Sequence, residues 1–328
     1  RSEGALLRYA GLSPFARPMP SSAPHDLLPP EITVLERGWL SANNILFIGH
    51  HDTAIVDTGY CSHAEQTVDL VRGALAGRAL DRVLNTHLHS DHCGGNALLQ
   101  SVYPHLTTLI PPGESEAVSR WDAEALSYES TGQECPRFTF TDVLRPGQSL
   151  KMAKLDWHVM AAPGHDPHSV ILFEPTHRVL ISADALWANG FGVVFPELEG
   201  ISAFDEVAAT LDLIESLDAQ WVIPGHGPVF FGVDVALNNA RKKLNGFVQN
   251  PAKHAKYGAK VLLKYKLLEL NKVPLQQFVA WAAQVRYFKV LHQTYSPNSS
   301  VQDWVLEMLK DLERSNALEI QDEWLLNV

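Results

Sequence analysis

Short apolar segments bounded by turn residues recur along the first two thirds of the chain, as is typical of β-strands. They fall into two batches, and segments of helical periodicity lie among the strands of each batch. This order favours two packed sheets with helices on the outside. The predicted strands cover residues 31–37, 44–48, 53–56, 82–85, 155–162, 170–173, 178–182 and 220–223.

Apolar residues at a spacing of three and four predict the helices between these strands. In the segment 202–217, Phe204, Val207, Leu211 and Ile214 share one face. The segment 112–129 is predicted to be one long helix, since its acidic first turn suits the helix dipole. The other helices predicted in this part of the chain cover residues 62–75 and 97–101.

The pattern changes after about residue 232, where strands give way to long helical segments. These segments cover residues 234–248, 253–270, 274–283 and 301–315, and residues 317–320 and 323–327 can pair as a hairpin. Helices that end in a small hairpin indicate a winged-helix-like module. We therefore divide the chain into an extended, Pro-rich lead-in (1–30), a catalytic domain (31–232) and a mostly helical extension (233–328).

The composition fits a globular protein, with 46% hydrophobic and 19% charged residues among 328. No apolar run approaches the roughly 18 residues that a membrane-spanning helix needs, and we expect no membrane partner. The three cysteines, Cys61, Cys93 and Cys135, form no CxxC pair. This disfavours a disulfide framework, and a cytoplasmic location is the simplest expectation.

The net charge of −11 repels polyanions at long range and counts against nucleic acid as the substrate. A local basic patch could act against this overall sign, and most of the lysines lie in the C-terminal extension. A nucleic-acid substrate therefore stays open as an alternative.

The residues most suggestive of chemistry follow the strand at 82–85, in the motif His87-x-His89-x-Asp91-His92. Alternate side chains of an extended segment share a face, so His87 and His89 can reach one cation. A bend eased by the glycines at 94 and 95 would turn Asp91 and His92 towards a second cation. Imidazole and carboxylate are ligands that suit zinc.

Three later residues of the same chemical types stand at predicted strand ends beside turns. His165 follows Pro163-Gly164, Asp184 ends the strand at 178–182, and His226 lies between Gly225 and Gly227. Loops at strand ends are where a rigid sheet usually presents its functional groups. Together with the first motif, they predict a metal centre.

Asp57-Thr58-Gly59, the HxHxDH motif and the three later residues together resemble the metallo-β-lactamase superfamily. The likeness is to the dinuclear branch of glyoxalase II, lactonases, phosphodiesterases and β-lactamase-like proteins of the LACTB2 type. It implies an α/β fold, the αββα sandwich. The C-terminal extension resembles the winged-helix extension of the LACTB2-like group.

The resemblance also implies a role for each residue. The first metal is assigned to His87, His89 and His165, the second to Asp91, His92 and His226, and the bridge between them to Asp184. Asp57 is expected to orient the HxHxDH loop rather than to bind metal. True β-lactamases of the best-known subclass carry Cys where this chain has Asp184, so antibiotic hydrolysis is expected to be secondary.

Two zinc ions, or iron or manganese in their place, would hold a bridging hydroxide that attacks a carbonyl or phosphorus. The expected catalytic residues are Asp184, as the bridge, and Asp91, as a proton acceptor. Our leading hypothesis is hydrolysis of a small ester, thioester or lactone. An RNA or DNA phosphodiesterase and an iron-dependent sulfur dioxygenase stay open.

The aromatic, Gly-rich segment 185–196 follows the bridging residue. It can form an apolar wall for a small-molecule substrate, or it can pack in the core or in the interface of a homodimer. Both interpretations stay open from the sequence.

Overall fold

A computed structural model describes residues 28–328, so the predicted lead-in lies almost entirely outside the described residues. The first sheet has six strands in the order of the chain. Its first three strands pair antiparallel and the later ones are parallel. The strands are β1 (Ile32–Leu35), β2 (Asn44–Ile48), β3 (Thr53–Val56), β4 (Arg82–Leu84), β5 (Thr107–Ile110) and β6 (Asp142–Val143).

The second sheet also has six strands, in the order β12-β11-β10-β9-β8-β7. Only β10 and β11 run parallel, and the other neighbours are antiparallel. Its strands are β7 (Ser149–Met152), β8 (Leu155–Ala161), β9 (Val170–Glu174), β10 (Val179–Ala183), β11 (Trp221–Pro224) and β12 (Phe230–Phe231).

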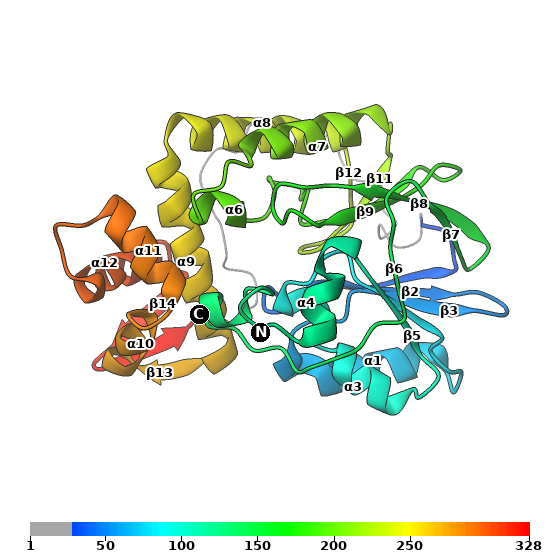
Figure 1. Ribbon diagram of the computed structural model, residues 1–328, viewed down its shortest axis with the longest axis horizontal. Coiled ribbons are helices and arrows are strands. Elements are labelled where there is room, and N and C mark those ends of the chain that lie inside the picture. The colour runs from blue at the N-terminus through cyan, green and yellow to red at the C-terminus, as the bar shows by residue number, and fades with distance from the viewer. Residues whose placement is uncertain (1–27) are drawn as a thin grey trace.

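The two sheets pack face to face with helices on both outer faces (Figure 1). Successive side chains of a strand point to opposite faces of the sheet. Ile45 and Phe47 of β2 therefore enter the core between the sheets, whereas Leu46 points towards the outer helices. The outer face of the first sheet is covered by α1 (Ala64–Leu75) and α3 (Asn96–Val102). The outer face of the second is covered by α7 (Phe204–Ser216) and α8 (Val233–Gln249). The predicted αββα fold is confirmed.

The C-terminal region is helical, as predicted. Its first helix, α8, is part of the sandwich, and the elements after it lie beside the sandwich (Figure 1). A three-stranded sheet, β13-β15-β14, packs with its helices around a separate apolar core. Among residues 28–328, no helix combines the length and the apolar character needed to cross a membrane. The elements are α9 (Pro251–Leu270), β13 (Lys272–Pro274), α10 (Leu275–Ala282), α11 (Arg286–Tyr295), α12 (Val301–Arg314), β14 (Leu318–Gln321) and β15 (Trp324–Asn327).

The long helix predicted for residues 112–129 is wrong. After a short 3-10 turn, α4 (Ser115–Arg120) ends at Trp121, whose φ of 56° is left-handed. The carboxylate of Asp122 then accepts the N–H of Ala125 and holds a turn. A further short helix, α5 (Tyr128–Thr131), follows. Strands β5, β6, β7, β12 and β13 and helices α6 (Phe195–Leu198) and α11 were not predicted.

Candidate metal centre

Five of the seven predicted site residues follow strands, as expected, and Asp91 and His92 lie in a turn of helix. His87 and His89 come after β4, His165 after β8, Asp184 after β10 and His226 after β11. Strands β3, β4 and β5 are parallel, so their carboxyl ends lie at one edge of the first sheet. The fold therefore brings together residues from widely separated parts of the chain.

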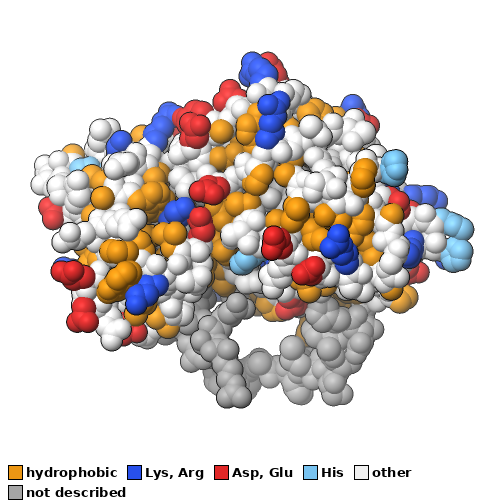
Figure 2. All heavy atoms as spheres, turned by 90° about the horizontal axis from the view of Figure 1, so that it is seen from below, with side chains coloured by type: hydrophobic (Ala, Val, Ile, Leu, Met, Phe, Trp, Pro, Cys, Tyr) orange, Lys and Arg blue, Asp and Glu red, His pale blue; other side chains and the backbone are white. Residues whose placement is uncertain are grey.

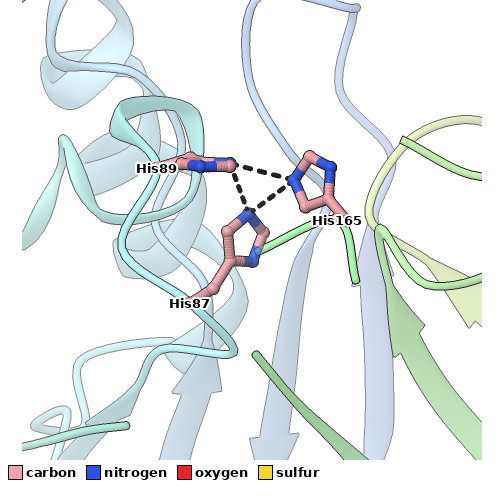
Figure 3. A group of neighbouring side chains, drawn as sticks. All are labelled: His87, His89 and His165. Carbon is pink, nitrogen blue, oxygen red and sulfur yellow. Dashed lines mark hydrogen bonds between the residues drawn. The ribbon is translucent and has the colours of Figure 1, made fainter. Parts of the chain in front are cut away.

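The imidazole nitrogens of three histidines converge at one point between the sheets (Figure 3). Nε2 of His87 lies 3.1 Å from Nδ1 of His89, which lies 2.9 Å from Nε2 of His165. The third side of the triangle, from His165 to His87, is 3.2 Å. A tetrahedral zinc with bonds of about 2.0–2.1 Å separates its ligand atoms by about 3.3 Å, so the triangle has the size that such an ion needs.

A second cluster joins Asp91, His92 and His226. Oδ2 of Asp91 lies 3.0 Å from Nε2 of His226 and 3.9 Å from Nε2 of His92. A turn of helix, α2 (Ser90–Cys93), presents the adjacent Asp91 and His92 together. The predicted bend at Asp91 and His92 is therefore made by α2.

Asp184 lies between the two clusters. Its Oδ2 is 3.4 Å from Nε2 of His165, whereas its Oδ1 is 3.5 Å from Nε2 of His92 and 3.9 Å from Nε2 of His226. The two oxygens of one carboxylate thus face different histidine groups. This is the position that the resemblance implied for a bridging residue.

Glycines next to the site make room for these side chains. A Cβ on Gly225 would lie 2.2 Å from Oδ1 of Asp184, so the turn that carries His226 can approach the carboxylate only with glycine there. Gly164, just before His165, has a φ of +132°, which L side chains rarely adopt. Both positions therefore need glycine for reasons of geometry.

Hydrogen bonds to the ring nitrogens that face away from the site fix the orientation of His92 and His165. Nδ1 of His92 donates to Oδ2 of Asp57 at 2.7 Å, and Nδ1 of His165 donates to the carbonyl of Val193 at 2.6 Å. Asp57 also accepts from the backbone N–H and the hydroxyl of Thr86. These bonds leave Nε2 of both histidines as the atom that faces the site. Asp57 thus contacts the HxHxDH loop as the resemblance implied.

The electrostatics of the site favour a cation. Burial, together with the neighbouring imidazoles of His92, His89 and His165, holds the pKa of His87 well below its usual value. Burial also lowers the pKa of His165 to about 4. Burial alone would raise the pKa of Asp184, but His92 and His226 outweigh it and keep the carboxyl ionised. Neutral imidazoles and an ionised carboxylate are the forms that bind metal, so His87, His165 and Asp184 are ready to bind a cation. His92 differs, because burial is outweighed by Asp57, Asp184 and Asp91, which hold its pKa well above the usual value, so a metal must displace a proton from this ring.

Two of the nitrogens that would bind metal, Nε2 of His92 and Nε2 of His165, are not matched to an ordinary hydrogen-bond partner among the described residues. Among the described residues, Nε2 of His92 is buried without a hydrogen bond. Because His165 donates through Nδ1, its neutral ring has only a lone pair at Nε2, and that lone pair points at two further imidazole nitrogens. A cation in each of the two clusters resolves these features, so the residues fit a metal centre.

Aromatic rings surround the site on two sides. Trp39 stacks on His226 with ring centroids 5.3 Å apart, and Trp187 packs edge-on against both rings. On the other side, the ring of Phe195 lies 4.7 Å from that of His89 and 5.6 Å from that of His165. In the segment 185–196, Trp187 and Phe195 therefore line the site. The core packing that the sequence also left open is found as well, at Leu186, Phe191, Val193 and Val194.

Two contributors were missed by the sequence reasoning. Trp39 lies in an irregular stretch before β2, and Nδ2 of Asn43 donates to the carbonyls of Pro224 and Gly227 around His226. Neither residue stands in a motif. They reach the site only because the fold brings the segment before β2 close to the segment around His226.

Comparison with known proteins agrees with this geometry. The Metallo-beta-lactamase superfamily profile matches residues 37–226. The chain belongs to this superfamily. The prediction of an enzyme of the metallo-β-lactamase type is thereby confirmed.

Individual relatives are distant. A hydroxyacylglutathione hydrolase of Synechococcus sp. (strain JA-3-3Ab) is 26% identical over 231 residues, covering 70% of this chain and 79% of that protein. The acyl-coenzyme A thioesterase MBLAC2 of Bos taurus is 26% identical over 215 residues, covering 58% and 74%. The crystal structure of a metallo-β-lactamase family protein from Thermus thermophilus covers 91% of this chain and 99% of its own, with a TM-score of 0.54 and 18% identity. This last likeness shows the fold alone.

Proposed function

We propose that this chain is a dinuclear metal-dependent hydrolase that cleaves a thioester, or a related small ester or lactone, with an apolar acyl group. The observation that carries the proposal is the position of Asp184, whose two oxygens face different histidine groups. Two of the relatives described above are named as thioester-cleaving enzymes, a hydroxyacylglutathione hydrolase and an acyl-coenzyme A thioesterase. They support the choice of a thioester within the broader class.

The proposed cofactor is a pair of zinc ions, with iron or manganese as the alternatives. Nitrogen and carboxylate ligands suit zinc. The first ion is assigned to His87, His89 and His165, the second to Asp91, His92 and His226, with Asp184 shared. When bound, such ions polarise a carbonyl oxygen and lower the pKa of water to about 7.

The two carboxylates of the site are assigned different tasks. The side chain of Asp184 is 7% exposed, whereas that of Asp91 is 15% exposed and more open to solvent. Asp184 also accepts a 3.3 Å hydrogen bond from Nε1 of Trp187, which helps to hold it in place. We therefore assign the structural bridge to Asp184 and the exchange of protons with solvent to Asp91.

The aromatic walls define the proposed acyl pocket. Trp39 and Trp187 stand at the His226 side, and Phe195 stands at the side of His89 and His165. All three side chains are only partly buried, so some of their surface is free to contact a ligand. Burying one aromatic or aliphatic group against such a wall contributes about 1.5–3 kcal/mol to binding.

The lysines of the C-terminal region support a small-molecule substrate over nucleic acid. Lys256 and Lys260 pair with Asp311, and Lys266 pairs with Glu269. Lys264 is buried. On the face drawn in Figure 2, Lys and Arg are scattered among Asp and Glu rather than gathered into a basic stripe. Charges already paired within the chain are poorly placed to hold successive phosphates.

We also propose a winged-helix-like relationship for residues 233–328. The order of α9, β13, three helices and the β14–β15 hairpin supports it. The strand β13 pairs with β15, so the hairpin is joined to the first strand as one small sheet.

A substrate panel on zinc-loaded protein tests the proposal. The probes are an acyl-glutathione thioester, acyl-coenzyme A esters of increasing chain length, an aryl lactone, nitrocefin and single-stranded RNA. We expect turnover of at least one thioester that exceeds the rate of free zinc and is lost in the chelator-treated protein. Salt-sensitive RNA cleavage without thioester turnover would show that the proposed substrate class is wrong.

A further inference from the structure

The segment between Phe191 and Phe195 is bonded directly to two residues of the metal centre. The carbonyl of Val193 accepts the 2.6 Å hydrogen bond from Nδ1 of His165, and the N–H of Phe195 donates to the carbonyl of the same histidine at 3.2 Å. The N–H of Gly192 donates to the carbonyl of Asp184 at 2.9 Å. The position of this segment therefore sets the orientation of the His165 ring.

The other side of the segment is held by two C-terminal helices. Nε2 of His254, in α9, accepts the N–H of Val194 at 3.2 Å. Nζ of Lys243, in α8, donates to the carbonyl of Phe191 at 2.7 Å. Both anchors lie beyond the residues that the superfamily profile matches, which end at 226.

His254 is built into the structure as a neutral acceptor. It is 2% exposed, and its ring lies 4.8 Å from that of Phe247 and 5.3 Å from that of Phe204. Burial, with a smaller effect from the charge of Lys243, lowers its pKa to about 4. At neutral pH the ring keeps a lone pair at Nε2, and the backbone of Val194 uses it.

Lys243 is held with similar specificity. Its ammonium lies 4.4 Å from the ring centroid of Tyr257 and 4.9 Å from that of Phe191, and it donates to the Tyr257 hydroxyl at 3.2 Å. Such cation–π contacts fix a flexible side chain in one direction. The ammonium group can therefore act as a fixed donor to the carbonyl of Phe191.

Apolar packing presses the same segment onto α9. Val193 and Leu198 belong to the C-terminal core, together with Ala255 and Ala259. A Cβ on Gly258 would lie 2.7 Å from Cδ1 of Leu198 and 3.2 Å from Cγ1 of Val193, so glycine lets the helix come this close. The hydrogen bonds of His254 and Lys243 thus lie in a tightly packed contact.

We propose that His254 and Lys243 are positioning residues, through which the C-terminal helices fix the Val193 carbonyl and hence the His165 ring. The inference rests on the proposed function, in which His165 is a metal ligand. The C-terminal region then supplies part of the support for the metal centre, although none of the candidate ligands found in the described part of the chain comes from it.

The test compares His254→Leu, which removes the acceptor, with His254→Gln, whose amide oxygen can still accept from Val194. The control is His292→Leu, on α11, where the ring bonds to Ser299 and packs against Trp304, both within the C-terminal region. Zinc affinity is measured by chelator competition, and kcat and KM with the best thioester. We expect His254→Leu to lose about 10–100-fold in affinity for one zinc ion and to lose kcat more than KM. His254→Gln should recover most of the affinity, and His292→Leu should match the wild type.

Wild-type zinc affinity in a folded His254→Leu variant would overturn the proposal. So would equal losses in the Leu and Gln variants, since packing rather than the hydrogen bond would then be responsible. If His254→Leu does not fold, Lys243→Met cuts the second anchor, and unchanged zinc affinity there has the same meaning. A wild type that binds two zinc ions but cleaves no thioester would refute the proposed substrate and leave this inference standing.

Discussion

Nδ1 of His92 donates a 2.7 Å hydrogen bond to Oδ2 of Asp57, and both side chains are almost completely buried. The φ of Asp57 is +58°, a left-handed conformation that Asp and Asn tolerate better than most residues. The same carboxylate accepts two hydrogen bonds from Thr86. One residue at the end of β3 thus holds both the start of the HxHxDH loop and the ring of a candidate ligand.

Asp57→Asn should keep the fold and weaken metal binding. Asn suits the backbone conformation, but it keeps only one of the two acceptor oxygens. Either Oδ1, which accepts from the Thr86 N–H, or Oδ2, which accepts from the Thr86 hydroxyl and His92, is then replaced by a neutral amide group. We expect a loss of about 10–100-fold in affinity for the second metal, as is usual when an outer partner of a ligand is removed. Chelator competition checks this, with Asp69→Asn on the exposed face of α1 as the matched control. Equal affinities in the two variants would contradict the orienting role.

Asp184→Asn should also fold, but it should lose most activity. The amide offers one neutral oxygen where the carboxylate offers two charged ones, so the two histidine groups no longer share a ligand. We expect kcat to fall by at least about 100-fold, which is more than the loss of a residue that only hydrogen-bonds a ligand would cause. We also expect the variant to retain fewer than two metal ions per chain after dialysis. Unchanged turnover together with unchanged metal content would refute the dinuclear centre.

Trp39→Ala should raise the KM for substrates with a long apolar acyl group. Removing the indole deletes one wall, at a cost of about 1.5–3 kcal/mol, or roughly 10–100-fold in binding. Because Trp39 also stacks on His226, metal content must be measured in the same samples. Trp324→Ala, on the exposed hairpin, is the control. A KM increase that is equal for short and long acyl chains would argue against the acyl pocket.

Lys264 predicts a pH dependence of stability. Burial lowers its pKa to about 8, while an unfolded lysine titrates at about 10.4. Between these values the unfolded chain holds more protons, so this residue makes the free energy of unfolding rise with pH from about 8 to 10. Urea unfolding at both pH values should show that rise reduced in Lys264→Met. The exposed Lys310→Met should keep the wild-type rise, and identical behaviour of the two variants would contradict the prediction.

Local patterns were enough to locate the candidate ligands and to predict most of the sandwich. Five of the seven predicted ligand residues follow strands, and Asp91 and His92 lie in α2. The nitrogens of His87, His89 and His165 meet as expected, and Asp184 groups with His87 and His92. Each such residue is set by its own strand and turn, and these are properties of a short segment. The helices α8, α9 and α12 were also predicted because each has a continuous apolar face.

Features that depend on long-range packing were not predictable. Strand β6 has only two residues, and residues 112–129 look helical until Trp121 adopts a left-handed conformation. Trp39 contacts His226, and His254 contacts Val194, only because the fold brings distant segments together. An isolated Trp or His carries no local signal of such a partner.

The central claim, two metal ions that share Asp184, is tested most directly by anomalous diffraction from crystals of the zinc-loaded protein. Data collected on either side of the zinc absorption edge locate each ion independently of the positions assigned to its ligands. The account predicts two peaks, one among His87, His89 and His165 and one among Asp91, His92 and His226, with the Asp184 carboxylate between them. A single peak, or peaks away from these side chains, would contradict it.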